Sequence, residues 1–145
     1  MRFAIISTIL SLVLLAGCTL PPPPPAFLQR VDFDVLNPAP DQPPLTLSIL
    51  RTGYGLGDEI PVTLEVNLPP KELKQATIQV HLFREGVPKP IHRIALSQLR
   101  AGKLTLHMNT STLPAGFYRL DGTLTPPTGS LSTQSVSFTL TEYVI

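Results

Sequence analysis

The sequence predicts an all-β protein, built as a two-sheet sandwich of seven to eight antiparallel strands. From residue 27 onward, apolar and polar residues alternate in short runs, which is the pattern of strands with one buried face. Gly, Pro, Asn and Asp bound these runs, with turns about every 8 to 12 residues. No segment keeps a helical period for about twelve residues, so helices are not expected to form the core.

The first half of the chain predicts four strands, each with an inward-facing apolar set. Proline-rich residues 37–44 separate the first two runs, and glycine-rich residues 53–58 separate the second from the third. Residues 69–74 precede the fourth run and favour one helical turn, since proline is tolerated at a helix start. The predicted inward residues are Val31, Phe33 and Val35; Leu45, Leu47 and Ile49; Ile60, Val62, Leu64 and Val66; and Ile78, Val80 and Leu82.

The second half predicts four more strands of the same kind. Turn residues at 86–90, 100–102, 111–116 and 126–130 separate them. Two apolar faces packed about 10 Å apart would bury the inward sets of both halves. A closed barrel is the competing architecture, because alternation alone does not exclude it. The predicted inward residues are Ile94 and Leu96; Leu104, Leu106 and Met108; Tyr118, Leu120 and Leu124; and Val136, Phe138 and Leu140.

The N-terminal residues have the order of a secretory signal peptide. Arg2 supplies a positive charge, residues 3–15 are predominantly apolar, and Ala16 and Gly17 are small. The apolar stretch is about 13 residues long, whereas a helix needs roughly 20 to cross a membrane. A cleaved signal is therefore favoured over a permanent transmembrane anchor.

The four residues Leu15, Ala16, Gly17 and Cys18 resemble the lipobox of bacterial lipoproteins. The resemblance implies that the chain is cut before Cys18, that the thiol carries a diacylglycerol, and that the new N-terminus is acylated. Several acyl chains give a stable membrane anchor. The alternative is a chance thiol in an ordinary signal peptide. Lipidation of Cys18 leaves no thiol for a disulfide, because the chain has one cysteine.

This interpretation predicts three parts: a signal peptide (1–17), a lipidated cysteine with a polyproline tether (18–26), and the sandwich (27–145). Residues 21–25 are all proline and favour an extended polyproline II segment. The alternative, a ligand for proline-binding domains, fits a cytosolic protein better. The expected location is the cell envelope, on the outer side of the cytoplasmic membrane or in the outer membrane. Thr19 stands where some Gram-negative lipoproteins carry an inner-membrane aspartate, which favours the outer membrane there.

Two short motifs resemble the immunoglobulin-like modules of bacterial envelope and macroglobulin-type proteins. They are YGLGDEI at residues 54–60 and LPAGFYRL at residues 113–120, and each leads into a predicted strand. The resemblance covers about residues 45–145 and implies an immunoglobulin-like sandwich. It bears on fold rather than function. An antibody-type domain is not implied, because the chain has no tryptophan and no cysteine pair.

Composition argues against several functional classes. The chain has 11 lysines and arginines against 10 aspartates and glutamates, and removal of Arg2 with residues 1–17 makes these charges equal. No excess of charge therefore points to nucleic acid. Gly53, Gly55 and Gly57 lead into a strand rather than a helix, so they predict a turn and not a phosphate-binding loop.

We expect a non-catalytic protein without cofactor or small-molecule substrate. No Gly-x-Ser-x-Gly motif is present, and the hydroxyl groups of residues 123–141 alternate as they do on an exposed sheet face. His81, His92 and His107 lack neighbouring ligands in sequence and predict solvated surface histidines rather than a zinc site.

A calcium site formed by Asp32, Asp34, Asp58 and Glu59 stays an open alternative, although their spacing is not that of an EF-hand. Such carboxylates more often keep an edge strand soluble. No metal site is therefore assigned.

Three large apolar residues fall on the polar side of their predicted strands: Leu50, Phe83 and Phe117. If they are exposed together, they form a patch of the kind that marks a partner surface. A shift of one residue in strand register would bury them instead. They are the candidate partner-binding residues.

The predicted function is a lipid-anchored cell-envelope module that binds protein or polymer without catalysis. Its expected partners are the membrane, through the lipid on Cys18, and another envelope protein or polymer. The alternative is a structural or accessory lipoprotein of an envelope assembly such as a secretion or pilus apparatus. A hydrolase is a third hypothesis, which requires a cleft with convergent polar residues.

Overall fold

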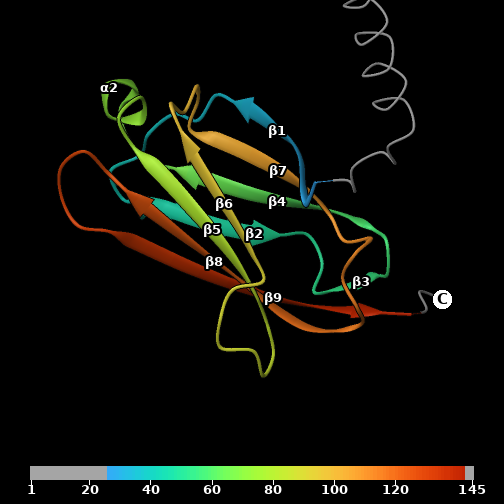
Figure 1. The fold of residues 1–145 in the computed structure, drawn as a ribbon. Helices are drawn as coiled ribbons and strands as arrows, with labels where there is room; N and C mark the ends of the chain where they lie inside the picture. Colours follow the sequence, from blue (N-terminus) through green and yellow to red (C-terminus); the bar gives the residue numbers. More distant parts are fainter. Residues whose placement is uncertain (1–25, 143–145) are drawn as a thin grey trace, which may run out of the picture.

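A computed structural model describes residues 26–142 as two β-sheets and one short helix (Figure 1). The predicted signal peptide and Cys18 lie outside the described residues, as does most of the tether. Within residues 26–142, no helix is long and apolar enough to cross a membrane. The elements are β1 (Leu28–Asp34), β2 (Leu45–Ile49), β3 (Gly53–Gly55), β4 (Glu59–Val66), α2 (Pro70–Leu73), β5 (Thr77–Arg84), β6 (His92–Ser97), β7 (Lys103–Asn109), β8 (Gly116–Thr125) and β9 (Ser132–Thr141).

The strands form an open two-layer sandwich. One sheet has the order β1-β7-β4-β2 and the other the order β3-β9-β8-β5-β6. Neighbouring strands are antiparallel except for β3 and β9, which run parallel. The predicted two-sheet sandwich is confirmed, and the closed barrel is wrong for the described chain because each sheet has two edge strands.

The strand order is that of an immunoglobulin-like domain. β2, β4 and β7 follow the order of strands A, B and E, and β9, β8 and β5 follow that of G, F and C. β1 takes the edge position of strand D, although it comes from the start of the domain. Near the start of β8, the Tyr118 hydroxyl donates a hydrogen bond to the Pro114 carbonyl oxygen at 2.5 Å. This tyrosine corner at strand F is a further hallmark of the fold.

The core lies between the sheets and consists almost entirely of the predicted inward residues. Val31, Phe33, Ile49, Leu96 and Val136 are partly buried, and the other predicted residues are buried, with one exception. The prediction was wrong for Val35, which is 77% exposed because β1 ends one residue earlier, at Asp34. The core also contains residues that alternation did not indicate: Tyr54, Leu73, Ala76, Leu99 and Leu113.

Two turn predictions had different outcomes. The predicted helical turn is present as α2. The glycine-rich turn is only partly present, because Gly57 has a φ of 84° whereas Gly53 and Gly55 belong to β3. The ladder with β9 joins residues more than eighty positions apart. Local periodicity contains no information about such a pairing, which explains why residues 26–142 contain nine strands instead of the predicted seven to eight.

Candidate functional site

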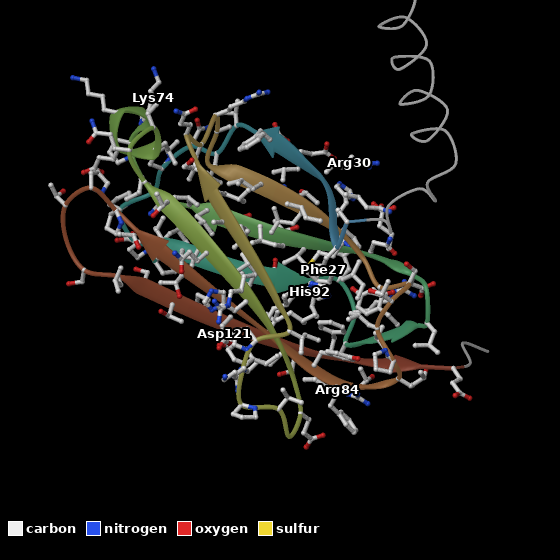
Figure 2. The ribbon with its side chains drawn as sticks, in the orientation of Figure 1. Phe27, Arg30, Lys74, Arg84, His92 and Asp121 are labelled. Atoms are coloured by element: carbon white, nitrogen blue, oxygen red, sulfur yellow. The ribbon has the colours of Figure 1, made fainter. Side chains whose placement is uncertain are left out.

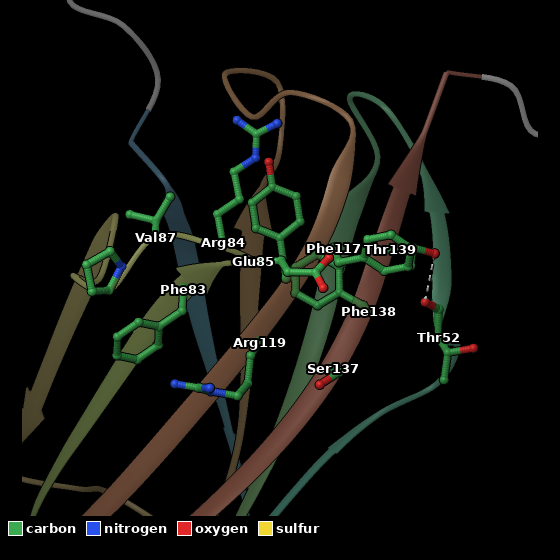
Figure 3. A pocket seen from close by; sticks show the side chains of 13 residues that line it. Thr52, Phe83, Arg84, Glu85, Val87, Phe117, Arg119, Ser137, Phe138 and Thr139 are labelled. Atoms are coloured by element: carbon green, nitrogen blue, oxygen red, sulfur yellow. Dashed lines mark hydrogen bonds between the residues drawn. The ribbon is translucent and has the colours of Figure 1, made fainter.

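A groove of about 730 Å³ lies on the outward face of the five-stranded sheet, where β5 ends and β8 begins (Figure 3). Its floor consists of outward side chains from three adjacent strands. The loop after β5 forms one side of the groove, and Thr52 forms another. The floor residues are Phe83 from β5, Phe117 and Arg119 from β8, and Ser137 and Thr139 from β9.

Strand register brings these five side chains together. Arg119 lies opposite Phe83 on one side and opposite Ser137 on the other. Phe117 lies opposite Thr139 in the next row. Since successive side chains point to opposite faces of a sheet, residues in these rows share one face. The sheet therefore assembles the groove from three segments that are far apart in sequence.

Arg119 is the central polar group of the groove and is held in place by its neighbours. Its guanidinium carbon lies 4.6 Å from the centre of the Phe83 ring. Its Nε donates to Asp121 Oδ1 at 2.9 Å, and Ser135 Oγ donates to the same oxygen at 2.7 Å. Cation–π and ion-pair contacts together fix the guanidinium over the ring. The two terminal nitrogens of Arg119 donate to no other described residue, which leaves them available to a ligand.

The wall formed by the loop after β5 is tied to the beginning of β8. The Glu85 amide donates to the Phe117 carbonyl oxygen at 2.9 Å. Arg84 Nη2 donates to the Ala115 carbonyl oxygen at 3.2 Å. Gly86 has a φ of 82°, a conformation that glycine adopts without steric cost. The wall is thus fixed before a ligand arrives, which lowers the entropic cost of binding.

Two of the three residues singled out in the sequence line this groove. Phe117 is 62% exposed and Phe83 is partly buried. Leu50 is 85% exposed, but it is not among the lining residues. Sequence reasoning missed Arg119, which becomes visible only when β5 and β8 are paired. Whether these residues bind a partner stays a prediction.

The lining suits recognition of an apolar group next to a negative charge. The exposed ring of Phe117 and the partly buried ring of Phe83 supply apolar area. The charged side chains are Arg84, Arg119 and Glu85, which together carry a net positive charge. Within the described chain, the hydroxyl groups of Ser137 and Thr139 are not hydrogen-bonded to any histidine or carboxylate. A hydroxyl nucleophile needs such a base within hydrogen-bond reach.

The prediction of a solvated His107 was wrong. The His107 side chain is only 13% exposed and lies between two carboxylates on the opposite sheet. Nε2 is 2.7 Å from Asp32 Oδ2, and Nδ1 is 2.8 Å from Glu59 Oε1. The hydrogen bond from His107 holds the pKa of Asp32 below its usual value.

These contacts also occupy the carboxylates considered for calcium. Asp32 and Glu59 bind His107, and Asp58 Oδ2 accepts from the Gly55 amide at 2.9 Å. In the chain from residue 26 to 142, no group of three or more His, Cys, Asp or Glu side chains could hold a metal ion. The cluster of His107, Asp32 and Glu59 links β7, β1 and β4, and its role is to hold these three strands together.

His92 also differs from the prediction, because its ring stacks on Phe27 with centroids 4.3 Å apart (Figure 2). Burial lowers the pKa of His92 below its usual value of 6.5. The unfolded chain therefore binds more protons than the folded one between the lowered pKa and about 6.5. This contribution to stability is present above 6.5 and is lost as the pH falls.

We expect His92→Phe to retain the stack and remove this titration. In urea unfolding at pH 7 and pH 5, the acid-induced loss of stability should be smaller in His92→Phe than in the wild type. The difference between the two proteins isolates His92 from the other two histidines. An equal loss in both would show that His92 does not contribute to acid sensitivity.

Comparison with known proteins identifies no family. No protein-family model matches the chain, and no curated protein matches it. The chain is similar to the PmoD soluble domain from a Methylocystis species, with a TM-score of 0.47 and 12% identity over 67% of this chain and 90% of that one. A superoxide reductase from Ignicoccus hospitalis has a TM-score of 0.46 and 12% identity, over 67% of this chain and 80% of that one. A lipoprotein from Bacteroides thetaiotaomicron has a TM-score of 0.40 and 12% identity, over 69% of this chain and 82% of that one. Likenesses this weak establish no function.

Proposed function

We propose that the protein is a lipid-anchored module of the bacterial cell envelope that binds another envelope component through the groove, without catalysis. The observation that carries the binding role is the groove itself. It exposes Phe117 beside a fixed arginine, on a platform of paired strands. Exposed aromatic groups next to arginine are typical of residues that dominate binding energy at interfaces.

The proposed anchor is Cys18, which follows Leu15, Ala16 and Gly17 in a lipobox-like order. Residues 21–25 would then form the tether, and an extended tether of this length spans about 15 to 25 Å. The tether leads to Phe27, whose ring stacks on His92 at the start of β6. His92 lies opposite Leu82, and Leu82 directly precedes the groove residue Phe83 in β5. The groove would therefore occupy the tethered end of the domain, which favours a partner near the membrane.

A pull-down from detergent-solubilised envelope tests this function. The full-length wild type is compared with the double variant Phe83→Ala/Phe117→Ala and with Leu131→Ala. Leu131 is a matched control, because it is 63% exposed and lies outside the groove. We expect an envelope component to co-purify with the wild type and with Leu131→Ala. Its recovery should fall at least about tenfold with the double variant, since each central aromatic contributes more than about 1 kcal/mol.

Equal recovery with all three proteins, or no recovery with any, would contradict binding through the groove. The stoichiometry separates the two roles considered from the sequence. A fixed ratio to a multi-component complex would assign the protein to an envelope assembly as an accessory lipoprotein. Capture of a glycan or of a foreign protein would assign it to recognition.

A further inference from the structure

We propose that the free edge of β9 binds an extended peptide segment of the partner by strand addition, and that one side chain of this segment enters the groove. The inference rests on the proposed function and specifies the chemistry of the partner. The two neighbours of β9 cover it unequally. β9 pairs with β8 from Ser132 to Leu140, whereas β3 covers only Thr139, Leu140 and Thr141. Residues 132–138 have no strand on their outer side within the described chain.

The direction of the free backbone groups follows from one hydrogen bond. The Thr139 amide donates outward, to the Thr52 carbonyl oxygen at 2.8 Å. The ladder between β8 and β9 is uninterrupted from Ser132 to Leu140, so every second residue points the same way. Thr133, Ser135 and Ser137 therefore direct their N–H and C=O groups to the open edge. All three residues are exposed, and their outward groups have no partner in the described chain.

This edge lacks the features that protect the other edges. Proteins commonly block edge strands with charges, prolines, irregular pairing or short length. β1 carries Arg30, Asp32 and Asp34, and its register shifts between Leu28 and Arg30. β6 carries Arg93, and β2 is only five residues long and follows two prolines. Residues 132–138 contain neither a charge nor a proline. The open part of β9 is thus the least protected edge.

The groove adjoins this edge and provides the specificity. Ser137 belongs to both, and Thr52, at the end of the open stretch, bounds the groove (Figure 3). Gly53 lies opposite Thr139 and has no side chain to cover the corner. An added strand would lie about 4.8 Å from β9. A long side chain beside Ser137 would then cross this small residue and reach Arg119 and Phe117.

The partner segment should alternate polar and apolar residues, with a large apolar side chain next to an acidic one. The apolar side chain matches the two phenylalanines, and the acidic one matches the positive charge of the groove. Such binding uses main-chain hydrogen bonds for affinity and a pocket for specificity. A second copy of this chain is less suited, because pairing one β9 edge with another would leave both grooves empty.

The test uses peptides selected from a displayed random decapeptide library on the soluble chain of residues 19–145. The described core lies entirely between Leu45 and Leu140, so this chain retains it. The selected peptides are synthesised and their affinities are measured for Ser135→Pro and Ser135→Ala. Proline removes the outward amide and is tolerated on an edge strand. Alanine removes the same hydroxyl but keeps the amide.

We expect Ser135→Pro to bind at least about tenfold more weakly than Ser135→Ala, and Phe117→Ala to bind more weakly than Leu131→Ala. Peptide binding should slow hydrogen exchange at the amides of Thr133, Ser135 and Ser137. If Ser135→Pro does not fold, the pair Thr133→Pro and Thr133→Ala replaces the pair at position 135.

Equal binding by the proline and alanine variants overturns strand addition. If Phe117→Ala still weakens binding, the groove function survives; if it does not, both proposals fail. A dimer of the free chain that Ser135→Pro dissociates would assign the edge to a second copy and also overturn the proposal.

Discussion

Replacing Cys18 with serine is expected to release the protein from the membrane fraction. Two or three acyl chains bind a bilayer stably, at about 0.8 kcal/mol for each buried methylene, whereas a single chain is marginal. Serine cannot form the thioether, so all of this anchoring energy is lost. Within residues 26–142, no helix that could span a membrane replaces it.

The measurement combines labelling with palmitate and fractionation of cells that produce the full-length chain. The wild type should carry label and sediment with membranes, and Cys18→Ser should do neither. Pro23→Ala, a change in the predicted tether, should behave like the wild type. Retention of Cys18→Ser in the membrane fraction would show that another segment anchors the protein.

The second large effect is expected from Leu120→Ala, in the centre of β8. Leu120 is fully buried and pairs with Leu82 on one side and Val136 on the other. Truncating a buried leucine costs about 2 to 5 kcal/mol, through lost burial and the cavity that remains. Since domains are typically stable by about 5 to 15 kcal/mol, this is a large part of the total.

Urea unfolding of residues 19–145 measures this effect. The control is Leu131→Ala, the same chemical change at a position that is 63% exposed. The control should change stability by less than about 0.5 kcal/mol. Similar losses in the two variants would contradict the placement of the core between the sheets.

The strands could be predicted from sequence because alternation is a local property. Leu64, Leu106 and Leu120 lie in runs in which every second residue is apolar, and all three are fully buried. Pairing is not local. The parallel ladder of β3 with β9, and the position of β1 at the edge usually taken by strand D, depend on contacts between distant segments. Val35 shows that alternation does not fix where a strand ends, since the alternation continues to Val35 whereas β1 ends at Asp34.

The candidate site was predictable only in part for the same reason. Phe83 and Phe117 each stood out as apolar residues on a polar face. Leu50 stood out equally, yet it does not line the groove. Arg119 carries no signal in its own strand, because its importance comes from the Phe83 ring on the neighbouring strand. Likewise, His107 has no carboxylate near it in sequence, and the sheet brings Asp32 and Glu59 to its two nitrogens.

If the groove faces a partner in the envelope, crosslinking in intact cells should capture that partner. A photo-crosslinking amino acid is placed at position 83, 117, 50 or 131 of the full-length chain, and captured proteins are identified by mass spectrometry. We predict that positions 83 and 117 capture the same envelope protein and that position 131 does not. Capture at position 50 would extend the surface beyond the groove. No capture from 83 and 117, or the same capture from 131, would contradict binding through the groove.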